Sequence, residues 1–424
     1  MRIVVIGLGY VGLPLAVQLA KHFETWGLDI NATRIEELKR RHDRTDEVTA
    51  EMLATSTLRL TANPDDCPAA DAYIVTVPTP IDSTNRPDLS PVVGATRMVA
   101  KMIDPARVPV IVYESTVYPG VTEDICGPLL EEVGDLSRGR DFKLGYSPER
   151  INPGDREHTV DKITKVIAGE NADVTEKLAT IYGAVTSGGV FRAASIKAAE
   201  AAKVIENAQR DINIAFMNEV TQIFSKLDLS IWDVLAAANT KWNFLPFQPG
   251  LVGGHCIGVD PYYLSHRAQE LGHDPQVILS GRAINDGMGK WIAEQIHAAR
   301  GGIAGSVLML GLTFKENVPD LRNSKVVDVI RHLQALGHDV TVHDPLANAD
   351  DAQREYGIPL ASGALSGLYD CVVGAVAHQA YRELSAAVER LVAADGLLID
   401  LKRMWPSLRE KYSDGATNIK YWSF

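Results

Sequence analysis

Short apolar runs alternate with amphipathic stretches along most of the chain, beginning at its first residues. Residues 2–6, RIVVI, have the pattern of a short buried strand, which runs directly into the glycine-rich segment GLGYVG at 7–12. The following PLAVQLAKHF has helical spacing, and TWGLDI at 25–30 has the pattern of a second strand. The pattern therefore predicts a βαβ unit with glycines at the turn between its first strand and its helix.

Three further strands are predicted at 71–80, 108–120 and 144–155, and polar residues follow the apolar part of each. In an open parallel sheet, ligands bind beyond the carboxyl ends of the strands. Thr79, Thr116 and Glu149 stand at these ends, so we expect them near a cofactor or substrate. For each threonine, a role in the loop or in capping a helix is an equal alternative.

From about residue 193 the apolar positions recur every three or four residues without a proline, which predicts one long amphipathic helix. At 1.5 Å per residue it would extend roughly 50 Å. Such a helix is typical of a spine between domains and of a dimer interface. Its apolar positions are Ile205, Ala208, Ile212, Ala215, Phe216, Ile223 and Leu227.

The last third of the chain repeats the first third in outline. A strand at 306–314 runs into a glycine turn, a helix follows at 326–337, and HDVTVHDP at 338–345 is a strand that ends in an acid. We therefore expect an α/β protein with two Rossmann-like, doubly wound domains joined by a long central helix and a helical middle domain. The expected domains are a first Rossmann-like domain at 1–192, a central helical domain at 193–292 and a second Rossmann-like domain at 293–424.

Composition narrows the class of protein. With 424 residues, 46% of them hydrophobic, the chain can fill two or three cores. It has neither the long apolar core of a signal peptide nor a run of about 18 apolar residues, so we expect no membrane association. Its four cysteines are far apart, which indicates a reducing cytoplasm and neither a disulfide framework nor a zinc site. A net charge of −12 argues against nucleic-acid binding.

The glycine-rich turn matches the dinucleotide fingerprint GxGxxG. Gly7 permits a tight turn, Gly9 admits a pyrophosphate and Gly12 lets helix and strand pack closely. Asp29 ends the second strand close to the ~20-residue spacing of the ribose-binding acid, which favours NAD over NADP. Arg34 could hold a 2′-phosphate or could equally face solvent. The residues expected at the cofactor in this unit are Gly7, Gly9, Tyr10, Val11, Gly12, Asp29, Arg34, Thr79 and Thr116.

The segment PGLVGGHCIGVDPYYL at 249–264 places Cys256 between glycines and an aspartate. A lone cysteine is more often a small buried hydrophobe than a nucleophile. Here, however, Gly253 and Gly254 would allow a ligand to approach closely, and Asp260 places a carboxylate soon after the sulfur. His255 fits a structural or substrate-contact role better than that of a base. His266 and His273 do not combine with it at metal-ligand spacing, so no metal is expected.

Lys203 and Asn207 stand four residues apart on the predicted long helix, so both side chains project from one face. An ammonium beside an amide could hold a developing oxyanion, and the ammonium would lower the pKa of a nearby thiol. The alternative is an ordinary solvated lysine and an asparagine on the helix face.

Seven motifs in order resemble the UDP-glucose/GDP-mannose dehydrogenase family over essentially the whole chain. They are GLGYVGLPLA, VPTP, STVYPG, SPER, AAKVIENAQRDINIAFMNE, GGHCIGVD and LGLTFKENVPDLRNS. The resemblance implies that Cys256 is the nucleophile, that Lys203 and Asn207 stabilise the oxyanion, and that Glu149 and Asp260 handle protons and hydrolytic water. It also implies that Thr116 helps to position that water.

The same resemblance implies that residues 1–192 bind NAD, that 193–292 mediate dimerisation and that 293–424 bind the UDP-sugar. Lys315 and Arg322 would bind at the cofactor and interdomain face, and Lys402 or Arg403 would contact the substrate, with Arg403 preferred. The full set of substrate-binding residues so implied is Glu149, Arg150, Lys203, Asn207, Gly253, His255, Lys315 and Arg403. The glycine turn of the last third lacks the full GxGxxG, so we expect no second NAD there but a degraded site for another nucleotide.

The implied reaction is a four-electron oxidation of a sugar C6 alcohol by two NAD molecules, through a thiohemiacetal and then a thioester on Cys256. UDP-glucose enzymes usually carry Gly-Gly-Ser-Cys, whereas this chain has His255 before Cys256 and Tyr262-Tyr263 after Asp260. That departure resembles the UDP-N-acetylhexosamine branch, and within it the UDP-N-acetylglucosamine enzymes. UDP-N-acetylgalactosamine, UDP-N-acetylmannosamine and UDP-glucose remain open as substrates. A two-electron β-hydroxyacid dehydrogenase and a catalytically silent NAD-binding sensor are the further alternatives.

Overall fold

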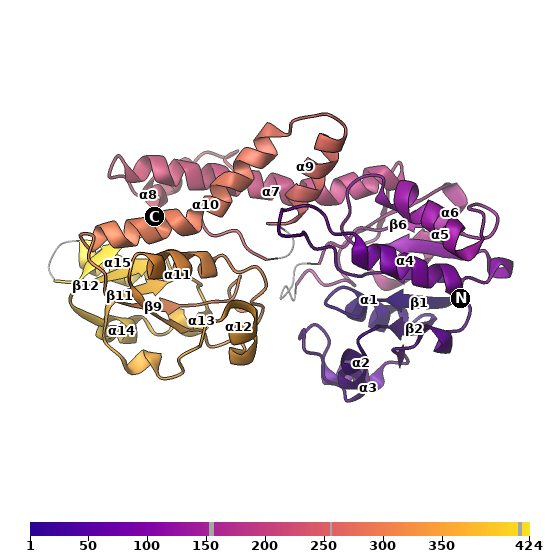
Figure 1. Ribbon diagram of the computed structural model, residues 1–424, viewed down its shortest axis with the longest axis horizontal. Helices are drawn as coiled ribbons and strands as arrows, with labels where there is room; N and C mark the ends of the chain where they lie inside the picture. Colours follow the sequence, from indigo (N-terminus) through magenta and orange to yellow (C-terminus); the bar gives the residue numbers. More distant parts are fainter. Residues whose placement is uncertain (152–156, 255–256, 414–417) are drawn as a thin grey trace. The chain divides into compact units, whose positions relative to one another are not determined.

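The computed structural model describes residues 1–151, 157–254, 257–413 and 418–424. The chain forms two compact units, each with its own sheet (Figure 1). The N-terminal unit contains Met1–Asn207 and Tyr262–His273, and the C-terminal unit contains Ala208–Pro261 and Asp274–Phe424. The division between them falls inside the long helix, and the expected limit at residue 292 falls inside helix α10 (Gln276–Ala299).

The sheet of the N-terminal unit has the order β3-β2-β1-β4-β5-β6-β7-β8. All neighbouring strands are parallel except β6 and β7. The chain runs outward from β1 in one direction and then in the other, which is the doubly wound topology. Its strands are β1 (Arg2–Ile6), β2 (Glu24–Leu28), β3 (Arg59–Thr61), β4 (Ala72–Val75), β5 (Val110–Tyr113), β6 (Lys143–Tyr146), β7 (Lys165–Gly169) and β8 (Val190–Arg192).

Successive side chains of each strand point to opposite faces of the sheet, and helices bury both faces. Ile3 and Val5 of β1 share a core with helices α1 and α6. On the other face, the Tyr73 hydroxyl donates to the Met102 carbonyl at the end of α4. The helices of this unit are α1 (Gly12–Leu19), α2 (Ala32–Lys39), α3 (Ala50–Thr55), α4 (Ser90–Met102), a π-helix (Val121–Cys126), α5 (Gly127–Gly134) and α6 (Ala172–Val185).

The predicted long helix is α7, Ile196–Ser225, whose 30 residues correspond to about 45 Å. Several of its apolar side chains are exposed: Ile205 at 53%, Phe216 at 56% and Ile223 at 50%. An exposed apolar stripe on a helix commonly marks an interaction surface. The other helices between the two sheets in sequence are α8 (Ile231–Ala238), α9 (Asp260–Glu270) and α10.

The sheet of the C-terminal unit is parallel throughout, in the order β10-β9-β11-β12-β13. Val307 and Met309 of β9 face a core shared with α10 and α11, whereas Leu308 and Leu310 face a second core against α15. The remaining elements are β9 (Ser306–Leu310), α11 (Val326–Ala335), β10 (Asp339–His343), α12 (Ala349–Tyr356), β11 (Tyr369–Gly374), α13 (Gln379–Arg382), α14 (Ser385–Val388), β12 (Val392–Asp400), α15 (Pro406–Ser413) and β13 (Lys420–Trp422).

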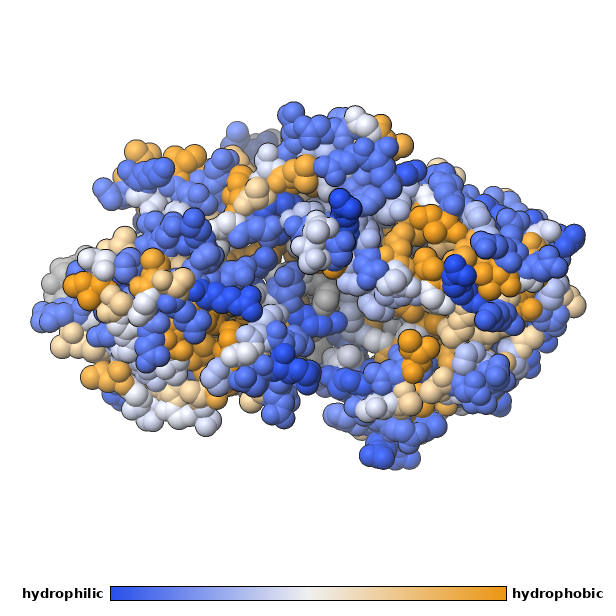
Figure 2. Space-filling view, in the orientation of Figure 1, coloured by the Kyte–Doolittle hydropathy of each residue, from blue (hydrophilic) through white to orange (hydrophobic). Residues whose placement is uncertain are grey.

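The expected α/β fold with two Rossmann-like sheets and a helical middle region is thus confirmed. Hydrophilic residues predominate on the face drawn in Figure 2, and apolar residues gather there in separate patches. Among the described residues, no helix is both long enough and apolar enough to span a membrane.

Candidate active site

The glycine turn of the N-terminal unit has the geometry that a dinucleotide requires. Gly7 has φ +90° and donates to the Leu28 carbonyl at 2.8 Å, which closes the turn against β2. A Cβ on Gly12 would lie 1.9 Å from the Gly7 oxygen and 2.3 Å from Thr76 Oγ1, whereas a Cβ on Gly9 would meet nothing within 4 Å. Gly12 therefore serves close packing, and Gly9 leaves open space beside the turn.

Asp29 lies directly after β2 and holds the turn from the other side. Its Oδ2 accepts from the Leu8 amide at 2.8 Å, and its Oδ1 accepts from the Asn31 amide at 2.9 Å. The residue is half-buried. Because a carboxylate has about four lone-pair sites, these two bonds leave acceptor capacity for a ribose.

Arg34 does not face solvent, so that alternative is wrong: the residue is 4% exposed. Its Nε donates to the Leu8 carbonyl at 2.9 Å, and its guanidinium pairs with Asp43 at 2.6 Å. Burial opposes ionisation of Asp43, but hydrogen bonds from Thr45 and Arg34 outweigh it and lower the pKa of that carboxyl. Arg34 thus stabilises the turn from behind.

These features fit NAD. Helix α1 begins at Gly12 without a side-chain cap, so its N-terminal amides are suited to a phosphate. Tyr10 and Val11, beside the open space at Gly9, are half-buried. Thr79 and Thr116, which follow β4 and β5, are also half-buried.

Glu149 is 7% exposed at the carboxyl end of β6, and its Oε1 accepts from the Ile151 amide. Its Oε2 is buried and has no hydrogen-bond partner among the described residues. A buried carboxylate oxygen ordinarily accepts a hydrogen bond, so this oxygen is suited to meet a bound group. Glu149 is therefore placed as a residue that binds substrate or moves a proton would be.

A buried charge pair that the sequence analysis missed lies next to Glu149. Lys165 Nζ is 2.9 Å from the Glu114 carboxylate, and both side chains have zero exposure. The Tyr182 hydroxyl donates to the other Glu114 oxygen. Burial raises the pKa of Glu114, with a further upward contribution from the Glu149 charge and an opposing one from Lys165. The signal in the sequence was a lone lysine at the start of the apolar run KVIAG at 165–169.

Lys203 and Asn207 are 6% and 7% exposed on α7, so the alternative of a solvated lysine is wrong. They lie one helical turn apart on α7, within the N-terminal unit. Thr116 and Glu149 belong to the same unit and lie in the loops that follow β5 and β6. Glu200, on the preceding turn, accepts from the amides of Gly120 (2.6 Å) and Thr122 (2.9 Å). It thereby fastens α7 to the loop that carries Thr116.

Arg150 lies on the surface beside this helix. Its guanidinium is 3.0 Å from the Glu206 carboxylate of α7 and also donates to the Thr164 carbonyl. Its expected contact with substrate is not tested by these bonds.

Cys256 and His255 lie outside the described residues, so their predicted roles stay predictions. A Cβ on Gly253 would lie 2.6 Å from the Asn323 carbonyl oxygen, and one on Gly254 would lie 2.8 Å from the Phe314 ring. In the direction of a Cβ, both glycines are therefore packed closely against the chain itself, and the expectation that they admit a ligand stays a prediction. Asp260, at the start of α9, is 2% exposed.

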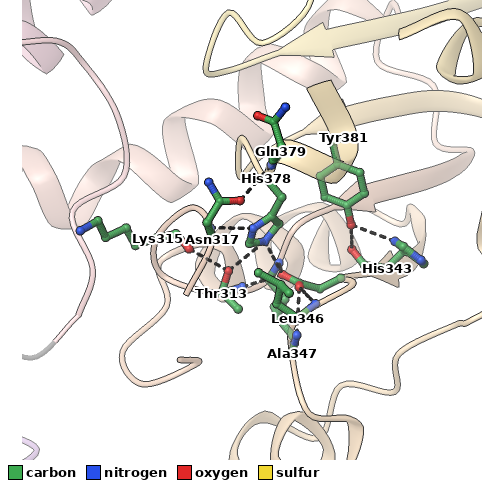
Figure 3. Close-up of polar contacts among 11 residues, drawn as sticks. Thr313, Lys315, Asn317, His343, Leu346, Ala347, His378, Gln379 and Tyr381 are labelled. Carbon is green, nitrogen blue, oxygen red and sulfur yellow. Dashed lines mark hydrogen bonds and ion pairs between the residues drawn. The ribbon is translucent and has the colours of Figure 1, made fainter. Parts of the chain in front are cut away.

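The C-terminal unit has a polar cluster at the carboxyl ends of β9, β10 and β11 (Figure 3). Asp344 Oδ2 accepts from the amides of Leu312 (2.6 Å) and Thr313 (2.9 Å), and His378 Nε2 lies 3.1 Å away. Its Oδ1 accepts from the amides of Leu346 and Ala347. Burial would raise the pKa of Asp344, but these hydrogen bonds outweigh it and lower that pKa. The acid at the end of this strand was evident from the sequence, whereas no local pattern marked His378.

The ligand-binding residues that the resemblance implies in this unit differ in exposure and in their neighbours. Lys315 is half-buried and its side chain points away from the polar cluster (Figure 3). Arg322 pairs with its neighbour Asp320 at 2.6 Å. Arg403 is exposed, whereas Lys402 Nζ lies close to Gly250. Burial lowers the pKa of Lys402, and nearby Glu316 partly offsets this shift.

Among the residues that the structure describes, no group of three His, Cys, Asp or Glu side chains could hold a metal ion.

Three domain models of one family match the chain in order. The NAD-binding domain of the UDP-glucose/GDP-mannose dehydrogenase family matches residues 1–186, the central domain matches 197–287, and the UDP-binding domain matches 308–407. Together they cover most of both sheets and of the helices between them, although β8 and β13 lie outside the matched residues.

Curated relatives match along nearly their whole length. A UDP-N-acetyl-D-glucosamine 6-dehydrogenase from Pseudomonas aeruginosa is 49% identical over 95% of this chain and 96% of its own. One of the same name from Salmonella typhi is 46% identical over 96% and 97%. Protein CapL from Staphylococcus aureus is 51% identical over 95% of both chains.

Solved structures agree with the fold. A UDP-D-ManNAc dehydrogenase from Pyrococcus horikoshii has a TM-score of 0.84 and 27% identity, and it covers 95% of this chain and 96% of its own. A UDP-glucose dehydrogenase from Pyrobaculum islandicum has a TM-score of 0.84 and 26% identity over 94% and 93%. With all three domains matched in order, the chain belongs to the UDP-glucose/GDP-mannose dehydrogenase family.

Proposed function

We propose that this NAD-dependent dehydrogenase oxidises the C6 alcohol of UDP-N-acetylglucosamine to the carboxylate. The observation that carries the proposal is full-length identity of 49% and 46% to two enzymes named for that substrate. The stretch from His255 to Tyr263, which departs from the UDP-glucose pattern, supports the same choice.

The proposed chemistry runs through Cys256. Two NAD molecules, bound in succession, would each accept one hydride from C6. After the first transfer, the Cys256 thiolate adds to the aldehyde carbon; after the second, water hydrolyses the thioester and regenerates the thiol. Lys203 and Asn207 hold the C6 oxygen, while Glu149 and Asp260 move protons to and from that oxygen and the water. The buried Oε2 of Glu149 without a partner supports its assignment.

The test is a count of NADH formed per sugar consumed with a panel of UDP-sugars. UDP-N-acetylglucosamine should give two NADH and the highest kcat/KM. A ratio of one would mean simple alcohol oxidation, and a higher kcat/KM for UDP-N-acetylgalactosamine, UDP-N-acetylmannosamine or UDP-glucose would reassign the substrate. No turnover with any sugar, despite NAD binding, would indicate a sensor.

Two variants test the residues. Cys256→Ser should lose the thioester-hydrolysis half of the reaction and keep slow or single-turnover hydride transfer. Cys67→Ser, at a half-buried site, is the control and should behave as wild type. Full steady-state activity of Cys256→Ser would rule out the covalent role. Lys203→Ala should lower kcat about a hundredfold or more and change NAD affinity little.

We also propose a homodimer formed through α7 and a cytoplasmic location. The exposed Ile205, Phe216 and Ile223 support the first. Free Cys67, Cys126 and Cys371 support a reducing compartment.

A further inference from the structure

The polar cluster of the C-terminal unit occupies the position at which open parallel sheets ordinarily bind ligands. In the order β10-β9-β11, the chain reverses direction between β9 and β11, so the switch point lies between these two strands. Thr313 follows β9 and His378 follows β11, and Thr313 Oγ1 is 3.0 Å from His378 Nε2. This contact bridges the switch point. Both residues are buried, so side chains fill the crevice that a ligand would enter.

The hydrogen-bond partners fix the proton on His378. Its Nδ1 accepts from the Asn317 amide at 3.0 Å, so the ring hydrogen is on Nε2. Thr313 Oγ1 donates to the Lys315 carbonyl, so it can only accept from His378. The Nε2 hydrogen is therefore shared between Thr313 and Asp344.

These bonds converge on the turn formed by residues 315–317. His378 holds the Asn317 amide, Thr313 holds the Lys315 carbonyl, and Asn317 Oδ1 accepts from the Gln379 amide at 2.9 Å. Asn317 has φ +60°, a left-handed conformation that asparagine adopts more readily than most residues and that these bonds maintain. As Figure 3 shows, the bonded atoms face the cluster while the Lys315 side chain points away from it.

Charge near the turn indicates the chemistry of the ligand. Lys315 belongs to the turn, and the charge of its neighbour Glu316 affects the pKa of Lys402, so Lys402 also lies near the turn. Two ammonium groups suit a diphosphate.

We propose that His378 is a positioning residue for the UDP-sugar: it fastens the 315–317 turn across the ends of β9, β10 and β11 so that Lys315 meets the diphosphate. The inference rests on the proposed function, because it assigns UDP to this unit. UDP binds outside the filled crevice and makes no contact with Asp344, whose five donors already surround it.

The experiment measures UDP and NAD dissociation constants of the full chain by calorimetry. His378→Ala should weaken UDP binding about tenfold and leave NAD binding unchanged. His378→Asn retains an acceptor near the Nδ1 position and should recover most of the affinity. Tyr381→Phe is the matched control: it keeps the ring whose centroid lies 5.6 Å from that of His378 and removes only partly buried hydrogen bonds to His343, so the bonds of the turn remain.

Each outcome has a distinct meaning. Unchanged UDP affinity in His378→Ala would overturn the inference, as would an equal loss in Tyr381→Phe, which would indicate general destabilisation. Failure of His378→Asn to bind UDP better than His378→Ala would also overturn it. If the unaltered chain binds NAD but no UDP, the proposed function fails first, and the inference with it.

Discussion

Lys165 Nζ lies 2.9 Å from the Glu114 carboxylate, with neither side chain exposed. The pair joins the start of β7 to the end of β5, next to β6, which Glu149 follows. Its ammonium also lies 5.1 Å from the centre of the Tyr182 ring. A charged pair without access to water depends on both partners, because either one left alone keeps its full desolvation penalty.

Lys165→Met should therefore lower the free energy of unfolding by about 3–5 kcal/mol, because it leaves Glu114 buried without its partner. The double variant Glu114→Gln/Lys165→Met should recover much of that loss. Urea denaturation of the three proteins measures both effects. Equal stability of the single and double variants would show that the two charges do not interact.

Glu200 should make stability depend on pH near neutrality. Burial raises its pKa to about 7, although the amides of Gly120 and Thr122 favour the carboxylate. A folded-state pKa above the unfolded value stabilises the protein at low pH, and that contribution is lost as pH rises through about 7.

The difference in melting temperature, wild type minus Glu200→Gln, should decrease as the pH rises from about 5 to about 8. Asp124→Asn, which removes an exposed partner of Lys197 near the same loop, serves as the control and should show no such trend there. A constant difference for Glu200→Gln across this range would show that Glu200 titrates normally.

Gly9 and Gly12 should respond in opposite ways to alanine. Gly12→Ala places a methyl group 1.9 Å from the Gly7 oxygen and should destabilise the fold. Gly9→Ala meets no atom of the chain within 4 Å, so it should melt like wild type but bind NAD at least about tenfold more weakly. Thermal melts with and without NAD separate the two effects, and normal NAD affinity of Gly9→Ala would place the pyrophosphate elsewhere.

Charge on the exposed side of α7 should dissociate the proposed homodimer. Phe216→Glu and Ile223→Glu alter side chains that are 56% and 50% exposed, so the monomer should remain folded. Light scattering after size exclusion should then give half the wild-type mass. Leu271→Glu, at an apolar side chain 70% exposed outside α7, should keep the wild-type mass. A wild-type monomer would refute the proposal.

Local pattern was sufficient to predict the N-terminal βαβ unit, Asp29 at its second strand end and the extent of α7. Each depends on neighbours in sequence: glycine spacing, strand length or helical period. The fold class followed from the repetition of that unit in the last third of the chain.

Partners distant in sequence could not be predicted in this way. Glu114 and Lys165 meet only because β5, β6 and β7 are neighbours in the sheet. Gly253 and Gly254 had the pattern of a ligand-binding segment, but their close neighbours are Asn323 and Phe314, which no local pattern brings there. His378 became informative only once Thr313 and Asn317 lay beside it.

Asp29 and Asp344 follow equivalent strands of the two sheets. Asp29 accepts two hydrogen bonds and keeps acceptor capacity, whereas the donors around Asp344 occupy its acceptor sites. A carboxylate at this position of a doubly wound sheet can thus act as a structural anchor when its acceptor sites are saturated. A dinucleotide site in the C-terminal unit would first require removal of hydrogen-bond donors from around Asp344. Restoring the missing glycines alone would leave the adenosine ribose without a carboxylate acceptor.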